Sequence, residues 1–530
     1  MNPNKEKNSF QRQAVILMVS TLIVRFLGFL YRLPMTAIIG DQGNAYYATA
    51  YNIYVFLLVL SAYGLPTAVA KLVSERVTLG RYKEAHRIFK IALFLAGIAG
   101  LTCSVFLAAF AKPLCNLVKM PQSYFSIIVL SPAVFIASVG AVFRGYFQGM
   151  KNSFPSAVSQ VVEQVFNMIF SVLIAWILVK SGLELGAAGG TIGTGAGAAA
   201  GFIVIFCIYR IKLPDIKRMV NDFQKENDSY VRSVDLISEI LKIAFPIIIG
   251  AAVFSLANIL DTVMVKDRLG KAVSEGEIVF TEDQANALFG QLSGKFSILA
   301  TMAASLSAAV AAAAVPNIAS ALKTGDGLHD KVNESLKLSM IISFPAATGL
   351  TILGGPIIQM LFPDNPEGGA LMTYGSISVV FLAFTQSVTS VLQGAGKVSI
   401  PVIGAVAGLL VKIVLNYALI SIPSVNIIGA VHSTTACYIA AGAIDAYFLR
   451  KYTGLRLNVK EVFVKPAVAS LVMGGGCCAV YNVVLYALRS NTVSVLAAVV
   501  AGAAIYFFVL DVTGALAGKY WDRLGERFWR

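Results

Sequence analysis

Apolar and polar positions form long alternating blocks along this chain of 530 residues. A helix needs about 20 mostly apolar residues to cross the hydrocarbon core of a bilayer, and runs of that length recur between short polar segments. The runs predict fourteen spanning helices, at 14–39, 46–70, 88–111, 124–147, 154–179, 186–209, 241–265, 286–314, 335–361, 371–394, 400–421, 428–449, 463–488 and 493–515. We therefore expect an all-α polytopic membrane protein.

The composition supports this class and excludes others. Hydrophobic types make up 57% of the residues and charged types 13%, about half of the charged fraction typical of a soluble chain. The net charge is +14, but the basic residues lie in short segments between apolar runs, which indicates membrane orientation and not a nucleic-acid partner. The six cysteines lie in or beside apolar runs without a CxxC motif, so we expect no metal and no cofactor.

The distribution of basic residues predicts how the chain is oriented. With the N-terminus in the cytoplasm, the cytoplasmic segments hold 31 of the 42 lysines and arginines, the opposite segments hold 7, and the remaining 4 lie within the runs. Positive charge accumulates on the cytoplasmic side of membrane proteins. One missed or added helix would reverse this bias downstream, so both termini are predicted to be cytoplasmic.

The chain also repeats itself at a shift of about 245 residues. Matching pairs are Ala70-Lys71 with Val315-Pro316, Gly80 with Gly325, Pro113 with Pro356, Gln148-Gly149 with Gln393-Gly394, Pro155 with Pro401, and Gly186-Ala187 with Gly429-Ala430. Six helices per copy give both copies the same orientation, as in transporters built from parallel repeats. We predict an N-terminal lobe at 1–210, a cytoplasmic linker at 211–240, a C-terminal lobe at 241–450, and two further helices with a cytoplasmic tail at 451–530. Seven glycines between 186 and 201 predict close packing of one helix.

Six charged residues stand out as candidates within the apolar runs, where a charge costs about 2.5–3.5 kcal/mol unless it faces a cavity or a partner. They are Arg25, Arg32, Glu163, Asp261, Lys295 and Lys412. Arg25 and Arg32 are seven residues apart and share one helix face. Asp445 lies near the inner end of its run, and we expect it to reach the interface.

Two interpretations of these charges stay open. Glu163 with Lys412, or Asp261 with Lys295, could form buried ion pairs that only hold helices together. Alternatively, all six residues line a substrate cavity. Four basic groups against two acidic ones make the interior cationic, which suits an anionic substrate, and the guanidinium fork suits phosphate.

Several motifs resemble known transporters. Arg25-Phe-Leu-Gly-Phe-Leu-Tyr-Arg32 resembles the first-helix motif of the MurJ lipid II flippases. The segments at 64–75, 144–149, 159–164 and 290–295 resemble the SpoVB-type polysaccharide transporters of Gram-positive bacteria. The resemblance spans nearly the whole chain and places it in the MATE/MOP superfamily.

The resemblance implies two six-helix lobes around a central cavity, with Arg25, Arg32 and Lys295 at basic positions of that cavity and the last two helices forming a groove for a lipid tail. It also implies a flippase in the bacterial cytoplasmic membrane, which moves an undecaprenyl-diphosphate-linked precursor by alternating access. A lipid-linked oligosaccharide and membrane lipids are then the partners, and a coupling ion or the membrane potential the drive. The chain departs from MurJ at Phe56-Leu-Leu-Val-Leu60, where that family has an arginine.

Two other functions remain. A cation-coupled drug antiporter of the same superfamily would favour acidic cavity residues, against the basic excess seen here. A non-transporting scaffold for wall synthesis would tolerate neutralisation of Arg25 and Arg32. An enzyme is not expected, because no nucleophile–base pair or metal cluster is visible in the sequence.

Overall fold

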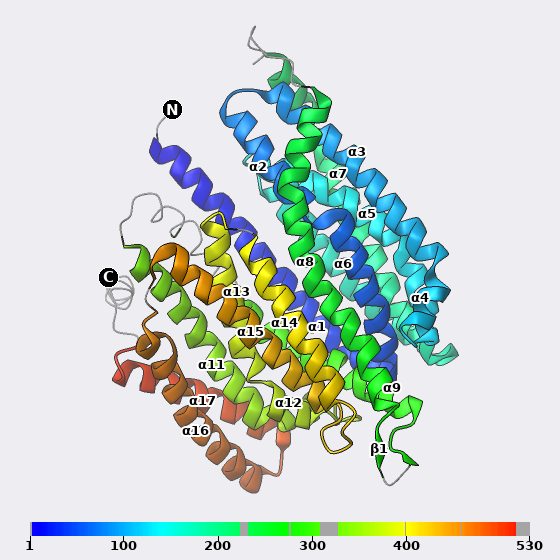
Figure 1. Ribbon diagram of the computed structural model, residues 1–530, viewed down its shortest axis with the longest axis vertical. Coiled ribbons are helices and arrows are strands. Elements are labelled where there is room, and N and C mark those ends of the chain that lie inside the picture. The colour runs from blue at the N-terminus through cyan, green and yellow to red at the C-terminus, as the bar shows by residue number, and fades with distance from the viewer. Residues whose placement is uncertain are drawn as a thin grey trace. The chain divides into compact units, whose positions relative to one another are not determined.

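The computed structural model describes residues 3–222, 232–274, 277–307, 318, 327–397, 399–455 and 457–515. The chain divides into two compact units, which are described separately below (Figure 1). Unit 1 consists of Met1–Asp267 and Glu282–Gly290, and unit 2 consists of Arg268–Thr281 and Gln291–Arg530.

The described residues of unit 1 form helices joined by turns. Its helices are α1 (Pro3–Leu58), α2 (Leu65–Thr78), α3 (Tyr82–Ala109), α4 (Ala111–Leu117), α5 (Tyr124–Gly149), α6 (Phe154–Leu178), α7 (Leu183–Asp222), α8 (Ser233–Leu269) and α9 (Glu282–Gln291), the last ending at the boundary with unit 2. A π-helical turn, Val59–Tyr63, joins α1 to α2. The predicted linker at 211–240 is helical at both ends, and its residues 223–231 lie outside the described part.

Unit 2 contains one short antiparallel pair of strands, β1 (Val273–Ser274) and β2 (Glu277–Ile278), and is otherwise helical where described. Its helices are α11 (Leu328–Leu361), α12 (Gly369–Gly375), α13 (Ser378–Gly394), α14 (Ile400–Leu419), α15 (Ile428–Thr453), α16 (Lys465–Leu488) and α17 (Asn491–Val512). π-helical turns precede two helical segments, at Leu292–Phe296 and Lys460–Val464.

Helix α1 contains the first predicted span and most of the second, because the chain turns back within it. Gly40 has φ +63°, a conformation that interrupts the helix. The hydroxyls of Tyr31 and Tyr47 lie 3.3 Å apart, whereas 16 residues of straight helix would separate them by about 24 Å. Thr36 and Asn44 also bond across the turn, at 3.3 Å. The predicted spans 14–39 and 46–70 therefore begin on two separate limbs.

Ten helical segments of the described residues are long and apolar enough to cross a membrane, and an eleventh arises if α12 and α13, bent by 52°, form one broken span. The run Val19–Thr78 counts once among the ten although it contains both limbs of α1. The predicted span 286–314 falls on α9, the π-helical turn and the helix up to Ser307, and its remaining residues lie outside the described part. The all-α polytopic fold is confirmed, and the count of fourteen stays a prediction.

The repeat is visible in how the helices begin and end. Helices α5 and α13 both end on the glycine of a Gln-Gly pair, at Gly149 and Gly394. The next helices, α6 and α14, both begin one residue before a proline, Pro155 or Pro401, where the missing N–H costs nothing. The repeat partners Val315-Pro316 and Gly325 lie outside the described residues. The lobe boundaries at 210 and 241 stay a prediction.

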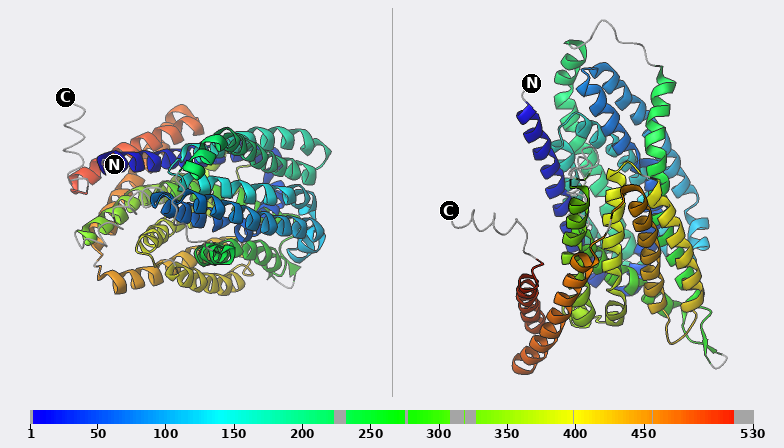
Figure 2. Two further views of the ribbon diagram at one scale, coloured as in Figure 1. Left: turned by 90° about the horizontal axis from the view of Figure 1, so that it is seen from above. Right: turned by 60° about the vertical axis from the view of Figure 1, so that its left-hand side comes forward.

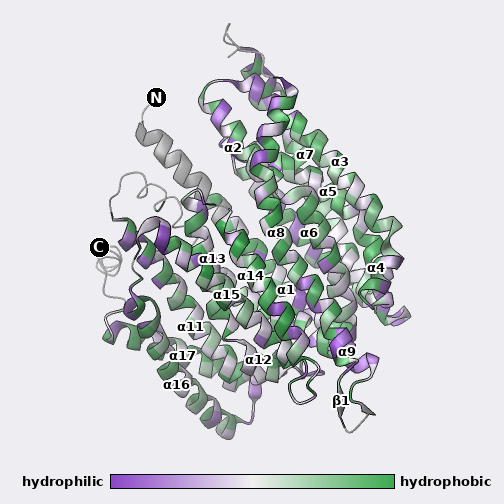
Figure 3. Cartoon of the chain, viewed as in Figure 1, coloured by the Kyte–Doolittle hydropathy of each residue, from purple (hydrophilic) through white to green (hydrophobic). Residues whose placement is uncertain are grey.

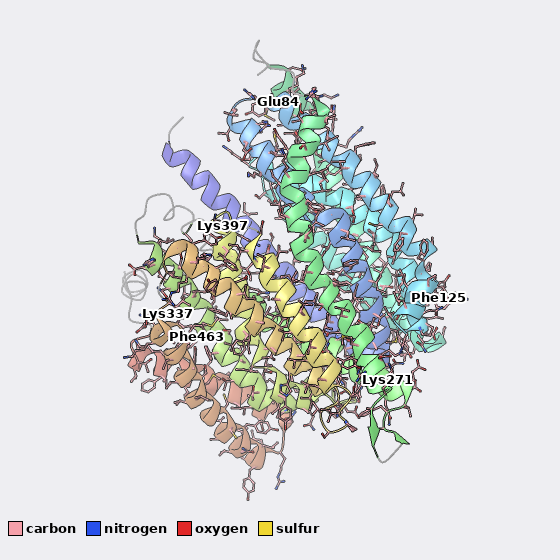
Figure 4. The ribbon with its side chains drawn as sticks, in the orientation of Figure 1. Glu84, Phe125, Lys271, Lys337, Lys397 and Phe463 are labelled. Carbon is pink, nitrogen blue, oxygen red and sulfur yellow. The ribbon has the colours of Figure 1, made fainter. Side chains whose placement is uncertain are left out.

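Helix α8 packs within unit 1, although the repeat would make it the first helix of the second copy. Its residues Leu236, Ile240 and Ala244 are buried in a cluster with α2, α3, α5 and α7. Arg76 on α2 adds polar contacts, since it pairs with Glu84 on α3 at 3.1 Å and with Glu239 on α8 at 2.7 Å. Glu84 is labelled in Figure 4. Three helices therefore converge on one guanidinium.

The helices turn large apolar side chains outward, as lipid requires. On α3 an exposed stripe at helical spacing comprises Phe94, Ile98, Leu101 and Val105, each more than half exposed. Hydrophobic colour covers the middle of most helices, and hydrophilic residues gather toward their ends (Figure 3). A soluble protein does not expose such continuous apolar surface, so the chain is an integral membrane protein.

Helices α16 and α17 run side by side in unit 2 (Figure 2). Met473 and Cys477 of α16 pack with Tyr506 of α17 and Leu353 of α11 in one buried cluster. The Tyr506 hydroxyl donates to the Ile341 carbonyl of α11 at 2.8 Å. This pair of helices therefore belongs to the same compact unit as the second copy of the repeat.

The glycines of α7 bring its backbone against α6. A Cβ at Gly193 would lie 2.1 Å from Ser171 Oγ, and one at Gly197 would lie 2.5 Å from the Glu163 carbonyl oxygen. Gly201 meets the Glu163 side chain in the same way. The predicted packing role of this glycine run is confirmed by these contacts.

We expect Gly193→Ala to lower the melting temperature of the detergent-purified protein, because overpacking at such a contact costs about 1–3 kcal/mol. Gly195→Ala is the matched control, since the nearest atom to a Cβ there is 4.0 Å away. Alanine favours a helix by about 1 kcal/mol over glycine, so Gly195→Ala should be neutral or slightly stabilising. Equal melting temperatures for the two variants would contradict the packing assignment.

Candidate functional site

Arg32 is held against tyrosine rings in unit 1. Its guanidinium carbon lies 5.3 Å from the ring centre of Tyr51 and 6.0 Å from that of Tyr47. These two rings stack on each other, with centres 5.7 Å apart and planes 12° apart. Cation–π contact of this kind is stronger where water is excluded. We call Arg32, Tyr31, Tyr47 and Tyr51 the tyrosine cage.

The tyrosine cage lacks a counter-charge. Among the residues that the structure describes, no carboxylate forms an ion pair with Arg32. A guanidinium carries five donors in a fixed fork, and ring faces and phenol oxygens compensate its charge only in part. Arg32 is therefore suited to receive an anion.

Arg25, the second predicted cationic residue of α1, is exposed in the structure. It lies two helical turns before Arg32, within electrostatic range of the Tyr63 hydroxyl. The two arginines thus share a face of the first limb of α1, as predicted, but only Arg32 is enclosed by aromatic rings.

Glu163 on α6 is paired with Arg144 on α5. An Arg144 Nη2–H donates to Glu163 Oε2, and the Arg144 Nε–H donates to Ser159 Oγ at 2.9 Å. The side chains of Arg144 and Glu163 are 19% and 31% exposed, so water screens the pair only partly. Glu163 therefore has a cationic partner within its own unit.

Sequence reasoning does not single out Arg144, because it lies near the end of an apolar run, where a long side chain can reach water. The turn between α5 and α6 is short, so the two helices are antiparallel neighbours. Arg144 and Ser159 are equidistant from the middle of that turn, and Glu163 is one helical turn further along α6. Hairpin geometry could therefore have identified the pair. The predicted partnership of Glu163 with Lys412 stays untested, because Lys412 belongs to unit 2.

Tyrosines connect the tyrosine cage with the Arg144–Glu163 pair. Tyr51 lies within electrostatic range of both Arg32 and Glu163, and Tyr54 lies within range of both Glu163 and Arg144. The rings of Tyr51 and Tyr54 are 5.9 Å apart. One polar cluster in unit 1 therefore contains two of the predicted site residues, Arg32 and Glu163.

Lys295 is buried in unit 2, with 1% of its surface exposed. Its ammonium donates to the Asn365 carbonyl at 2.9 Å and to the Glu367 carbonyl at 3.0 Å, and it lies 5.5 Å from the ring centre of Phe362. Lys295 thus binds the segment between α11 and α12, an arrangement that the sequence did not indicate. Its predicted role in substrate binding stays a prediction.

The other two predicted residues are on separate units. Asp261 is half-buried on α8 of unit 1, and Lys412 is 5% exposed on α14 of unit 2. Because Asp261 and Lys295 belong to different units, their predicted ion pair is likewise untested.

The expectation for Asp445 was wrong. Its side chain does not reach an interface, because it is 1% exposed on α15 and accepts a hydrogen bond from Thr389 Oγ1 of α13 at 2.9 Å. Its other oxygen, Oδ1, has no hydrogen-bond partner among the described residues. A buried carboxylate in unit 2 was therefore left out of the predicted site.

Comparison with known proteins shows which family the chain belongs to. The family described as polysaccharide biosynthesis protein matches residues 10–322, more than half of the chain, and the family described as MatE matches residues 290–418. The chain therefore belongs to the polysaccharide biosynthesis protein family. The resemblance to the MATE/MOP superfamily that the motifs indicated is confirmed.

Individual relatives agree. The chain is 25% identical to the lipid II flippase MurJ of Bacillus subtilis (strain 168) over 484 residues, which cover 87% of this chain and 86% of that protein. It is 23% identical to stage V sporulation protein B of the same organism over 511 residues, 96% of each chain. A solved structure titled lipid II flippase MurJ, inward closed conformation, aligns with a TM-score of 0.67 at 15% identity, and the alignment covers 94% of this chain and 99% of that chain. The chain is a membrane transporter and not an enzyme.

We expect Glu163→Gln to destabilise the protein, because it leaves the Arg144 guanidinium without its counter-charge. Loss of one partner from a fully buried pair costs about 3–5 kcal/mol, and partial exposure reduces the cost here to about 1–3 kcal/mol. The double variant Arg144→Gln/Glu163→Gln should recover part of the loss, since neither charge remains. Melting temperatures of the three proteins in detergent test this. Strictly additive losses would show that the two side chains do not interact.

Proposed function

We propose that this protein is a flippase for an undecaprenyl-diphosphate-linked cell-wall or polysaccharide precursor. It moves the head group across the cytoplasmic membrane by alternating access, while the lipid tail stays among acyl chains. Two relatives support this substrate class: one is named lipid II flippase MurJ and the other stage V sporulation protein B. The match to the polysaccharide biosynthesis protein family supports it as well.

One observation carries the proposal, which is that Arg32 is enclosed by tyrosine rings and has no carboxylate partner among the described residues. A diphosphate offers two adjacent anionic groups, and arginine binds such groups bidentately. Arg25, two turns away on the same face of α1, provides a second cation at a spacing of about 10 Å. The other predicted residues, Glu163 and Asp261 of unit 1 and Lys295 and Lys412 of unit 2, are proposed to contact the substrate as well.

Aromatic faces add a second property to the tyrosine cage. Tyrosine combines an apolar ring with a hydroxyl that can bond a sugar or a phosphate oxygen. Tyr47 and Tyr51 hold the guanidinium in place before substrate arrives, and this pre-organisation reduces the entropy cost of binding. A lipid-linked saccharide diphosphate suits both parts of the cage.

The drive is proposed to be an ion gradient or the membrane potential. Moving one elementary charge through 100 mV supplies about 2.3 kcal/mol. Nucleotide hydrolysis is not expected within this chain, because the residues that stand five positions before Gly294-Lys295 and Gly396-Lys397, Phe289 and Val391, do not complete a phosphate-binding loop.

A cation-coupled drug antiporter is the second candidate, and the MatE match over 290–418 favours it. Such a protein needs acidic groups for a cationic substrate. The described cluster around Arg32 has the opposite polarity, so the flippase is the better-supported function.

We expect Arg32→Ala to reduce flipping of labelled lipid II in proteoliposomes by about 10- to 100-fold, since a charged hydrogen-bond partner contributes about 1.5–3 kcal/mol. Arg32→Lys should retain part of the activity, because it keeps the charge and loses the fork. Arg232→Ala is the control, as Arg232 is an exposed arginine paired locally with Asp235. Wild-type protein should also flip a shorter polyprenyl-diphosphate sugar.

Two results would reject this function. If Arg25→Ala and Arg32→Ala flip lipid II at the wild-type rate, the scaffold interpretation gains support. If no lipid-linked substrate moves while a cationic dye is exchanged for protons or Na⁺, the antiporter is favoured.

The proposed orientation has both termini in the cytoplasm and can be tested with single cysteines. After replacement of the six native cysteines, we expect Leu117→Cys to react with an impermeant maleimide on intact cells. Leu79→Cys should react only after permeabilisation. Both side chains are well exposed, at 70% and 57%, so access from one side or the other decides the labelling. The reverse pattern would invert the topology.

A further inference from the structure

A buried carboxylate lies where three helices of unit 2 meet. Asp445 on α15 is 1% exposed. The Thr389 hydroxyl of α13 donates to its Oδ2 at 2.9 Å. Gly404 of α14 closes the third side, because a Cβ there would lie 2.5 Å from Asp445 Oδ1. The side chain is therefore enclosed by protein and turned away from lipid.

The charge that an ionised Asp445 would carry has no compensation at this junction. In the part of the chain that the structure describes, Asp445 forms no ion pair and its Oδ1 has no hydrogen-bond donor. One neutral hydroxyl satisfies a small part of the four acceptor positions of a carboxylate. Burial of an unpaired charge is among the most costly arrangements in a protein.

The other titratable groups on the three helices are distant from Asp445 or face solvent. Helix α13 has none, and the only charged residue of α14 is Lys412, eight residues or about 12 Å beyond Gly404 along the helix. On α15, His432 is thirteen residues before Asp445, whereas Arg450 and Lys451 follow it and are exposed. The remaining titratable side chains of α14 and α15 are Cys437 and tyrosines. Lys397, in the turn between α13 and α14 (Figure 4), lies over the Tyr452 ring at 4.7 Å.

A hydrogen-bond acceptor lies close to Oδ1. Asp445 Oδ1 and the Ala441 carbonyl oxygen both lie within 3.0 Å of the point where a Cβ on Gly404 would stand. A carbonyl oxygen can accept a hydrogen bond from a protonated carboxyl group. Hard cations such as Mg²⁺ and Ca²⁺ gather about six or more oxygen ligands, and the contacts described here supply fewer.

The repeat shows that this junction differs from its counterpart in unit 1. Thr389 is five residues before Gly394, as Arg144 is five residues before Gly149. Arg144 gives Glu163 a permanent positive partner, whereas Thr389 gives Asp445 only a hydroxyl. Equivalent positions on α5 and α13 therefore hold a cation in one copy and an uncharged donor in the other, and the carboxylates that they contact lie on the non-equivalent helices α6 and α15.

We propose that Asp445 is a proton-binding site. It takes one proton from the aqueous phase onto Oδ1, is neutral while α13, α14 and α15 are packed as described here, and releases the proton when these helices separate and water reaches the carboxylate. Helix separation in unit 2 is thereby coupled to proton release. This deepens the proposed function by naming the coupling ion, but proton binding itself can be measured without transport.

Infrared difference spectra of the full-length protein in detergent, recorded between alkaline and acidic pH, provide the direct test. All 28 acidic residues contribute carboxylic-acid C=O absorption when protonated. Within that absorption, wild-type protein should show one component, called the acid band, that Asp445→Asn lacks. Asp511→Asn is the matched control, since Asp511 is an exposed acid on α17, and it should keep the band. A band of equal intensity in wild type and Asp445→Asn would overturn the assignment.

Thermal unfolding provides an independent measurement. The melting temperature of wild type should fall as pH rises, because ionisation places an uncompensated charge at the junction. Asp445→Asn, which mimics the neutral carboxyl, should lose this dependence, and an unchanged dependence contradicts the proposal. If Asp445→Asn does not fold, the variant Thr389→Val tests the assignment of the acid band instead. Removal of the hydrogen bond should shift the band in frequency, and an unshifted band would assign it elsewhere.

A final comparison separates the ligand from the transport function. If Na⁺ or Li⁺ at constant pH abolishes the acid band, a monovalent cation is the ligand and the proton assignment fails. If lipid II flipping by wild type is absent while the band behaves as expected, the proposed substrate fails and the proton site stands. If flipping depends on pH in wild type but not in Asp445→Asn, both are supported.

Discussion

The need to satisfy every polar group from within the protein determines how this structure is built. In hydrocarbon no water is available to bond an exposed charge or amide, so a buried ionisable group needs a partner within the protein or must be neutral. Arg144 holds Glu163 and Ser159 across the α5–α6 turn, and Lys295 holds two carbonyls between α11 and α12. Against this background, the tyrosine cage around Arg32 stands out, because neutral tyrosine rings and phenol oxygens compensate its charge only in part.

The sequence predicted the fold well because hydropathy and turn chemistry act locally. The Gln-Gly pairs at Gly149 and Gly394 ended helices in both copies as the repeat required. Hydropathy could not show where helices continue past the apolar runs. Helix α7 extends to Asp222 and helix α8 begins at Ser233, because polar residues at these ends also form helix. Nor could it reveal that α8 packs within unit 1, since that depends on tertiary contacts of Ala244 with Gly64.

The candidate site was harder to predict, and the reasons differ for each residue. Arg32 was identified because a charge in an apolar run is costly wherever it points. Its tyrosines were not, since aromatic residues in a membrane helix are ordinary lipid-facing or core residues. Arg144 and Asp445 lie near helix ends, where a charged side chain can often reach water. In the structure a glycine of a neighbouring helix packs against each carboxylate, Gly201 against Glu163 and Gly404 against Asp445.

The turn at Gly40 has a consequence for the arginine beneath it. Arg32 lies on the limb before the turn, and Tyr47 and Tyr51 lie on the limb after it. The contact between the guanidinium and the two rings therefore joins the two limbs. Arg32 is eight residues from the pivot, an arm of about 12 Å. Swinging one arm by about 20° would move its tip by about 4 Å, which carries the cation beyond the ~6 Å reach of an aromatic face. The backbone angle at Gly40 can thus determine whether the Arg32 guanidinium contacts the tyrosine rings or is available to a bound anion.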